Sequence, residues 1–231
     1  MEFSHRPALR QQYPDLAAGV LHTTGIRREA HAEALVRRHE AAARARLDAA
    51  ASESDLPQVQ AWRRAFARMG LKPTQYRCAS ESLLRRFRKE GALPRIHPLI
   101  DVCNAISMAY AIPVAVLDLA HVTGALQVRH ADGSERYLSF AGEWEHPEPG
   151  EVTFVDEAGQ AHARRWTHRQ SGLSAVRAST SQVLVIAEAM HPGAGDDMPQ
   201  LVQAVQEALA HAWGVPARSA ILTADAPRFS P

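Results

Sequence analysis

Two polar residues stand inside an apolar stretch near the middle of the chain. Asp101 and Asn104 are three positions apart within residues 96–110, most of which are hydrophobic. On a helix, positions i and i+3 share a face, so both side chains would point the same way. Such a pair can hold a water or a substrate hydroxyl, or it can tie a neighbouring loop to the helix. The residues alone leave both interpretations open.

A second polar segment, residues 166–174, reads Trp-Thr-His-Arg-Gln-Ser-Gly-Leu-Ser and lies between two expected strands. Successive backbone N–H groups in a glycine-containing turn can bind an oxyanion. Ser171 and Gly172 are the residues that we expect at such a site. An ordinary exposed hairpin loop would have the same composition, so this segment also has two interpretations.

Other catalytic patterns are absent from the sequence. None of the twelve histidines lies in an H-E-x-x-H pattern, and the two cysteines, Cys78 and Cys103, form no C-x-x-C pair that could complete a zinc site. The chain also lacks a G-x-S-x-G elbow, a Walker loop and a dinucleotide fingerprint. We therefore expect no metal, no cofactor and no covalent nucleophile, and we expect both cysteines to be buried thiols.

Helical patterns dominate the first half of the chain. Asp55 is the expected N-cap of a helix that has Pro57 in its first turn and ends at Gly70. Ser80 is the expected cap of a helix that ends at Gly91. Helices are expected over 27–51, 81–90 and 99–110, in addition to the one that follows Asp55. The helix over 99–110 is apolar almost all round, which is typical of a central helix.

The second half reads mainly as strands, and the order of elements predicts an α+β fold. N-terminal helices would pack on a mostly antiparallel β-sheet or sandwich. A loop is expected over 191–199 and a closing helix over 198–213. The expected strands are 16–24 near the N-terminus, then 125–129, 136–140, 152–155, 162–166 and 183–187.

Charge is unevenly distributed along the chain. Residues 1–98 carry 18 of the 26 Lys and Arg against 10 acids, whereas residues 99–231 carry 8 against 15. A basic half can bind phosphates, although most charge runs only solvate helix faces. The start of the chain has no signal-peptide pattern and no apolar run is long enough to cross a membrane, so a cytoplasmic protein is expected. The candidate RNA-binding residues are Arg85, Arg86, Arg88, Lys89 and Arg95.

Residues 93–104 read Leu-Pro-Arg-Ile-His-Pro-Leu-Ile-Asp-Val-Cys-Asn. This block resembles the tRNA-editing (B3/B4) domain of the phenylalanyl-tRNA synthetase beta subunit, and above all its freestanding relatives. His97 stands where the family usually has asparagine. Residues 113–118 look like the family's next block, but Ala115 replaces a histidine that the synthetase version carries in its pocket. Trp166 and Arg169 match a further segment.

The resemblance implies a trans-editing enzyme: a metal-independent aminoacyl-tRNA deacylase that hydrolyses the ester between a wrong amino acid and tRNA. Such a reaction needs a positioned water, donors for the oxyanion and a selective pocket. We assign Asn104 and His97 to the water and the terminal adenosine, and Gly172 to the oxyanion. The candidates for substrate binding are Asp101, Asp118, Ser171 and Glu188.

The substrate that the resemblance favours is canavanyl-tRNA(Arg), because freestanding members include an enzyme with this activity. Glu188 could pair with the guanidinium of canavanine in a bidentate manner, or it could simply meet an arginine of the protein. The partners would be aminoacyl-tRNA and, transiently, a synthetase. Alternatives are a deacylase for another mischarged tRNA, a non-catalytic tRNA-binding module, an enzyme for small aminoacyl esters, and a structural partner of a synthetase.

One domain over 1–231 is expected on this interpretation. Its parts would be a strand and basic helices over 1–92, the pocket-forming core over 93–190, and a C-terminal linker, helix and tail over 191–231.

Overall fold

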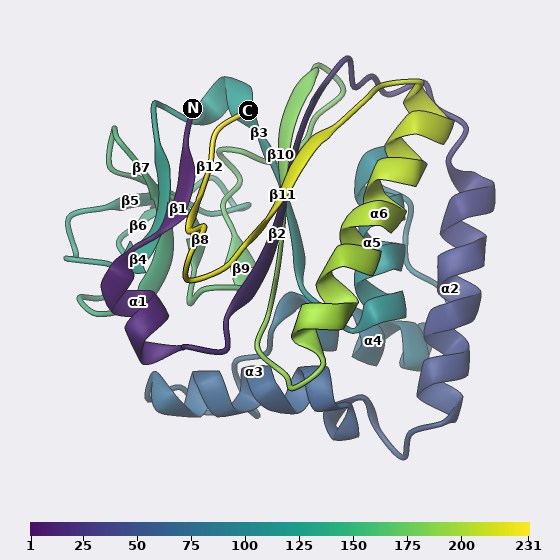
Figure 1. Ribbon diagram of the computed structural model, residues 1–231, viewed down its shortest axis with the longest axis horizontal. Coiled ribbons are helices and arrows are strands. Elements are labelled where there is room, and N and C mark those ends of the chain that lie inside the picture. The colour runs from purple at the N-terminus through teal and green to yellow at the C-terminus, as the bar shows by residue number, and fades with distance from the viewer.

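The computed structural model describes residues 1–231 and shows two stacked β-sheets with helices covering the outer face of one of them (Figure 1). Most strand pairs are antiparallel; β1 with β4 and β5 with β8 are parallel. The predicted α+β class is confirmed. The helices are α1 (Pro7–Gln12), α2 (Glu33–Asp48), α3 (Pro57–Arg68), α4 (Ala79–Glu90), α5 (Pro98–Tyr110) and α6 (Ala194–Trp213), with 3₁₀ turns at η1 (Glu53–Asp55) and η2 (Leu119–His121).

The inner sheet, which lies between the outer sheet and the helices, has four strands and is antiparallel throughout. It carries the longest strands, and its central pair aligns residues 17–24 with 182–189. Its strands, in spatial order, are β11 (Arg218–Leu222), β2 (Ala17–Thr24), β10 (Gln182–Ala189) and β3 (Val114–Asp118).

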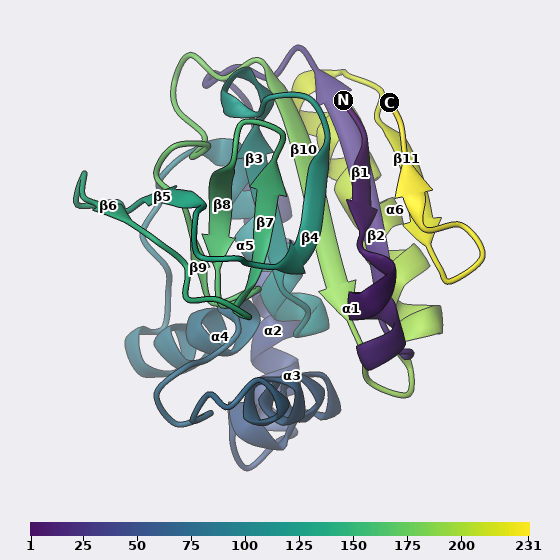
Figure 2. The ribbon, with the colours of Figure 1, turned by 90° about the vertical axis from the view of Figure 1, so that its left-hand side faces the viewer.

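The outer sheet faces the viewer in Figure 2 and includes both ends of the chain. The N-terminal strand β1 pairs with β12 on one side and with β4 on the other. The strands are, in spatial order, β12 (Arg228–Phe229), β1 (Phe3–His5), β4 (Leu126–His130), β7 (Val152–Asp156), β8 (Gln160–Arg164), β5 (Arg136–Leu138) and β6 (Trp144–Glu145), with β9 (Arg169–Gln170) beside β8.

Alternation along β10 decides which side chains enter each core layer. Val183, Val185 and Ala187 pack against the helices, in a core that includes residues of α2, α5 and α6. Leu184 and Ile186 point the other way, into the core between the two sheets. Since side chains of a strand alternate with period two, Glu188 falls on the side of Leu184 and Ile186. The strand register therefore places a carboxylate between the two sheets.

Most predicted elements are present, with shifted ends. The helix expected over 27–51 begins at Glu33 and ends at Asp48, and the strand expected over 162–166 ends at Arg164. The N-cap of α3 is Leu56 rather than Asp55, which belongs to η1. Ser80 lies within the first turn of α4, where its hydroxyl donates to the carbonyl of Ala111 at 3.0 Å, and Cys78 is the N-cap.

The loop expected over 191–199 is wrong, because α6 begins at Ala194 and includes Pro199. Asp196 and Asp197 lie in the first turn of this helix, where carboxylates interact favourably with the positive end of the helix dipole. Met198 is fully buried, so tertiary packing also favours the helix there. No helix in the structure is both long and apolar enough to cross a membrane.

Candidate functional site

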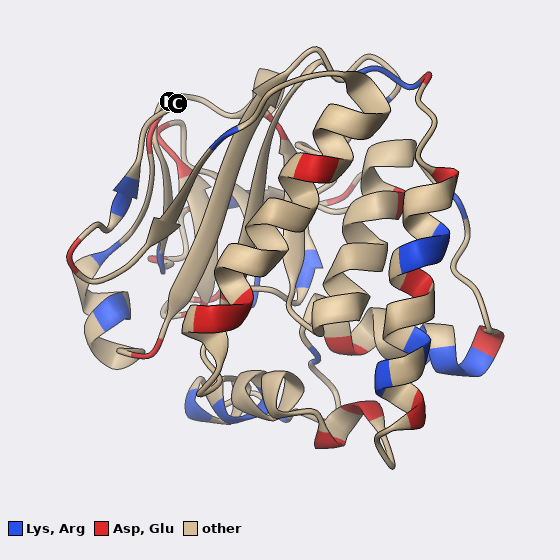
Figure 3. Ribbon diagram, turned by 45° about the vertical axis from the view of Figure 1, so that its right-hand side comes forward, with Lys and Arg blue, Asp and Glu red and all other residues tan.

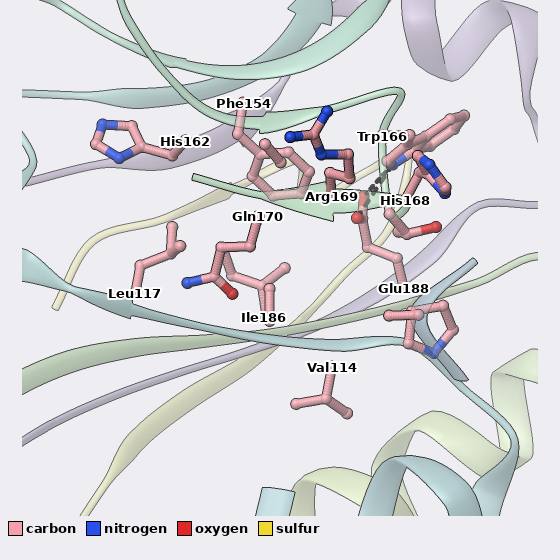
Figure 4. Close-up of a pocket in the computed structure, with 15 residues that line it drawn as sticks. Val114, Leu117, Phe154, His162, Trp166, His168, Arg169, Gln170, Ile186 and Glu188 are labelled. Carbon is pink, nitrogen blue, oxygen red and sulfur yellow. Dashed lines mark hydrogen bonds between the residues drawn. The ribbon is translucent and has the colours of Figure 1, made fainter. Parts of the chain in front are cut away.

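A cavity of about 70 Å³ lies between the two sheets, at the end where α5 leads into β3 (Figure 4). Ala115 and Leu117 of β3 and Ile186 of β10 form its inner wall, and Phe154 of β7 lies opposite. The segment 166–170 closes one side. Most of the wall is apolar, so polar groups that face the cavity stand out. These polar groups are His162, Thr167, His168, Arg169, Gln170 and Glu188.

Glu188 is the buried carboxylate of this cavity, with 2% of its surface exposed. The indole N–H of Trp166 donates to Oε1 at 3.0 Å and to Oε2 at 3.1 Å, and Nε2 of His5 lies 2.7 Å from Oε1. A carboxylate offers about four acceptor positions. Two protein donors therefore leave Glu188 able to accept hydrogen bonds from a ligand.

Arg10 fixes the tautomer of His5. Its Nη2 lies 3.2 Å from Nδ1 of His5, and a guanidinium can only donate, so Nδ1 is the acceptor. The proton of the neutral ring is then on Nε2, which donates to Glu188. A relay from Arg10 through His5 thus orients the carboxylate, and both residues of the relay come from the first strand and helix of the chain.

Two consecutive residues in the left-handed region place the indole of Trp166. Arg165 has φ 49° and Trp166 has φ 59°, although neither is glycine. Such a backbone is strained for residues with side chains and is found often at functional sites. The turn ends β8 at Arg164 and directs Trp166 inward, where it is fully buried and packs edge-on against Trp62 at 5.0 Å. Its N–H thereby reaches Glu188.

His168, one of the residues that line the cavity, has an unprotonated ring nitrogen. Its Nδ1 lies 2.8 Å from the carbonyl oxygen of Arg77, which can only accept, so Nδ1 carries the proton and Nε2 has a free lone pair. Burial lowers the pKa of His168 below its ordinary value; the bond to Arg77 opposes this shift, while the charges of Arg165 and Arg169 reinforce it. The ring is therefore neutral at pH 7 and can accept a proton.

His162, on the opposite wall, has no free nitrogen. Its Nδ1 lies 2.9 Å from Oγ of Ser174 and its Nε2 lies 3.3 Å from Oδ2 of Asp156. Ser174 is completely buried, and Asp156 also accepts from three backbone N–H groups of neighbouring turns. This trio ties the β7–β8 hairpin to the segment after β9; the buried hydroxyl is closed to a substrate.

Three of the residues assigned from the sequence to the pocket and the oxyanion are engaged elsewhere. The carboxylate of Asp118 accepts from the hydroxyl of Thr180 at 2.6 Å and from the N–H of Ala120 at 3.0 Å. Ser171 donates its hydroxyl to the carbonyl of Leu138, and Gly172 donates its N–H to the same carbonyl. The N–H of Gly172 is thus occupied in this conformation. A Cβ at this position would lie 3.0 Å from the carbonyl oxygen of Ser139, which favours glycine there.

His97, Asp101 and Asn104 lie on α5, away from the inter-sheet cavity. The cavity receives Pro113 and Val114 at the C-terminal end of this helix, whereas His97 is its N-cap. From Asp101 to the end of α5 at Tyr110, nine residues of helix rise by about 14 Å. His97 and Asp101 line a different cavity, and Asn104 lines neither of the two. The structure therefore does not bring the predicted catalytic and substrate-binding residues together: Glu188 lines the cavity between the sheets, and His97 and Asp101 line the other.

The candidate RNA-binding residues are exposed, and most of them pair with carboxylates. Arg85 and Arg88 lie 3.5 and 3.4 Å from Glu53, and Arg86 lies 2.8 Å from Glu90. Arg95 bonds both Glu33 and Glu40. Acidic and basic residues alternate along α2 in Figure 3. Lys89 is exposed and forms no ion pair in the structure. Because the arginines are paired with carboxylates, the positive electrostatic potential of this surface is weaker than the number of arginines indicates.

Several residues of the inter-sheet site were not identified as candidates from the sequence. His5 and Arg10 lie in a segment with no motif, and His168 was part of a polar turn without a role of its own. Gln170 faces the cavity and donates one N–H to the carbonyl of Val116 at 2.8 Å, which leaves its second N–H free. The only local signal was the polar composition of residues 166–174.

Comparisons with known proteins give a consistent assignment. A family model described as B3/4 domain matches residues 61–198. The phenylalanine–tRNA ligase beta subunit of Cereibacter sphaeroides is 33% identical over 76 residues, which are 33% of this chain and 9% of that protein. A crystal structure of an N-terminal fragment of the phenylalanyl-tRNA synthetase beta subunit from Pyrococcus horikoshii has a TM-score of 0.50 at 8% identity; the match covers 94% of this chain and 50% of that fragment. The chain therefore spans only part of the length of these relatives.

Proposed function

The chain belongs to the B3/4 domain family, and on that premise we propose that it hydrolyses the ester bond of a mischarged aminoacyl-tRNA. The observation that carries this proposal is the juxtaposition of Glu188, with unused acceptor capacity, and His168, with a free Nε2, at one cavity between the sheets. The first can recognise an amino acid and the second can accept a proton from water.

In this mechanism, His168 orients a water and accepts its proton as the oxygen attacks the ester carbonyl. The free N–H of Gln170 stabilises the negative charge on the carbonyl oxygen in the tetrahedral intermediate. The bond from carbon to the ribose oxygen then breaks, and the ribose oxygen takes up the proton from His168. No residue forms a covalent intermediate. The products are the free amino acid and uncharged tRNA.

Glu188 favours a cationic, N–H-rich amino acid. The only cation connected to this buried carboxylate by hydrogen bonds is Arg10, and it acts through the neutral ring of His5. A guanidinium could donate two N–H groups to the remaining acceptor positions and supply the missing positive charge. The substrate proposed here is therefore canavanyl-tRNA(Arg), in agreement with the chemistry expected from the resemblance.

The test is a deacylation assay on a panel of charged tRNAs: canavanyl-, arginyl- and tyrosyl-tRNA. We expect fast loss of canavanine, with arginyl-tRNA spared. Glu188→Gln should lose most of this activity, while Glu207→Gln, at an exposed position of α6, should retain it. Stable esters throughout the panel, with uncharged tRNA still bound, would instead identify a non-catalytic tRNA-binding module.

A further inference from the structure

The β5–β6 hairpin, residues 136–145, carries two exposed aromatic side chains. Phe140 is 72% exposed and Trp144 is 48% exposed, and they are two of the four large hydrophobic residues that the protein exposes. They are four positions apart, and in Figure 2 the hairpin extends from the body of the molecule at the left. Single exposed apolar residues are common on protein surfaces, but two aromatic rings on one projecting hairpin are a reason to look for a ligand.

The hairpin is bonded to the segment that closes the cavity between the sheets. The carbonyl of Leu138 accepts from the N–H of Gly172 at 2.9 Å, and the hydroxyl of Tyr137 donates to the carbonyl of Gln170 at 2.9 Å. A Cβ on Gly172 would lie 3.5 Å from Cα of Phe140. Gln170 lines the cavity, and two residues of chain, from Gln170 to Gly172, span at most about 7 Å. The backbone of Phe140 therefore lies beside the wall of the cavity.

This wall reaches the surface at Arg169, which lines the cavity and is exposed. Its Nη2 lies 3.4 Å from Oε1 of Glu145 on β6, and its guanidinium lies 5.5 Å from the ring centre of Tyr137 on β5. The exposed edge of the cavity is thus continuous with the hairpin. The substrate proposed above ends in unpaired nucleotides and carries the ester on its last ribose. A strand that brings this ester past Arg169 leaves the preceding bases beside the hairpin.

The charges of the hairpin do not favour phosphate. Arg136 and Glu143 form no ion pair and have opposite signs, and Glu145 pairs with both Arg164 and Arg169. The guanidinium of Arg136 lies 4.3 Å from the ring centre of Trp144, an arrangement that restricts the orientation of the indole. What the hairpin offers a ligand is therefore the faces of two rings, rather than a surplus of positive charge.

We propose that Phe140 and Trp144 stack with unpaired bases next to the 3′ end of tRNA. Every base has a flat π face, and exposed aromatic side chains bind unpaired bases by stacking on them. One ring needs only one base, whereas a stable protein interface needs about 800 Å² on each partner, which is more than two side chains provide. The size of the surface therefore fits single-stranded RNA. This inference rests on the proposed function for its choice of RNA.

Binding of an uncharged tRNA transcript, with and without its unpaired 3′ nucleotides, tests the proposal by fluorescence anisotropy. Phe140→Leu and Trp144→Leu should each weaken binding of the intact transcript about fivefold or more, because leucine is apolar but has no ring. Phe140→Tyr and Trp144→Tyr are the matched controls and should keep most of the affinity, since a ring remains.

The shortened transcript locates the contact on the RNA. All four variants should bind it with the affinity of the wild-type protein, because the bases that stack are missing. Wild-type affinity of both leucine variants for the intact transcript would overturn the proposal. An equal loss of affinity for the intact and the shortened transcript would also overturn it, since the rings would then contact another part of the tRNA.

A fluorescent base reports the stacking directly. 2-Aminopurine placed among the unpaired 3′ nucleotides should lose fluorescence on binding to the wild-type protein and to Trp144→Tyr. It should keep its fluorescence with the double variant Phe140→Leu, Trp144→Leu, and thermal unfolding of this variant checks that the sheet is intact. Unchanged tRNA binding by the double variant, together with self-association of the wild-type protein alone in sedimentation, would assign the hairpin to a second copy of the chain and overturn the proposal.

These measurements use RNA that carries no amino acid, so they do not depend on ester hydrolysis. Stacking without deacylation would support this inference and identify a tRNA-binding module. Deacylation with unchanged tRNA binding by the leucine variants would overturn the stacking contact and leave the proposed function intact.

Discussion

Nε2 of His5 and Oε1 of Glu188 lie 2.7 Å apart although 183 positions separate the two residues in the chain. The contact joins the outer sheet, through β1, to the inner sheet, through β10. His5 also lies outside the segment that matches the family model. The N-terminal part of the chain therefore contributes directly to the candidate site.

Replacement of His5 should destabilise the protein. His5→Phe removes the N–H that Glu188 accepts and leaves a buried carboxylate with one protein donor fewer, so the free energy of unfolding should fall by about 1–3 kcal/mol. His211→Phe, at an exposed position of α6, should change it by less than about 0.5 kcal/mol. Urea denaturation of both variants checks this. Equal stabilities would show that the His5–Glu188 contact contributes nothing.

His168 should set the acid limb of the deacylation rate. Its pKa is lowered below the ordinary 6.5, chiefly by burial, and only the neutral ring accepts a proton. kcat/KM should therefore be constant at pH 7 and above, and should fall as the pH drops through the lowered pKa of His168. His168→Gln should remove this limb and reduce kcat/KM at pH 7 by about 10². His211→Gln is the control, and survival of the limb in His168→Gln would exclude His168 as the base.

Stability should also decline below pH 6.5. The pKa values of His22, His39, His97 and His168 are all lowered in the folded protein, chiefly by burial. The unfolded chain then takes up protons at a higher pH than the folded one, so stability is complete above the unfolded pKa, about 6.5, and is lost as the pH falls. Urea midpoints at pH 7.5 and 5.5 measure this loss. A higher midpoint at pH 5.5 would contradict it.

Glu81 should be among the residues most sensitive to truncation. Its carboxylate is completely buried on α4 and lies 2.5 Å from Arg63 and 3.4 Å from Arg77. Glu81→Ala leaves two partly buried guanidinium groups without their partner, which should cost about 3 kcal/mol or more. Glu90→Ala on the same helix removes an exposed partner of Arg86 and should cost under about 1 kcal/mol. Chemical denaturation compares the two, and similar losses would disprove the structural role of Glu81.

Gly19 should tolerate no side chain, because β2 passes close to α6 there. A Cβ at Gly19 would overlap Val202 and lie 2.9 Å from Sδ of Met198. Gly19→Ala should therefore lower the free energy of unfolding by about 1–3 kcal/mol. Gly195 lies in α6 with no atom near its missing Cβ, so Gly195→Ala should be neutral or stabilise by up to about 1 kcal/mol. Thermal unfolding of the two variants measures these changes in stability. An unchanged stability of Gly19→Ala would contradict the close packing of β2 against α6.

Local patterns predicted α4, α5 and β10 well because each signal is contained within the element. Gly91 ends α4 with φ 79°, the apolar surface of α5 is buried, and the apolar run at 183–187 forms a buried strand. The same reasoning failed at 191–199. Pro199 and two aspartates are typical of a loop, but burial of Met198 and the helix dipole favour a helix, and a local pattern contains neither effect.

The sequence by itself determined the α+β class, most of the elements and the resemblance that led to the family, since periodicity, capping residues and motif spacing are properties of neighbouring residues. It also identified Glu188 as a candidate. Only the tertiary structure decided which polar groups meet at the cavity. The proton positions of His5 and His168 depend on Arg10 and on the carbonyl of Arg77, and the latter lies 91 positions from His168. Such contacts arise from the packing of distant segments, and local sequence carries no signal for them.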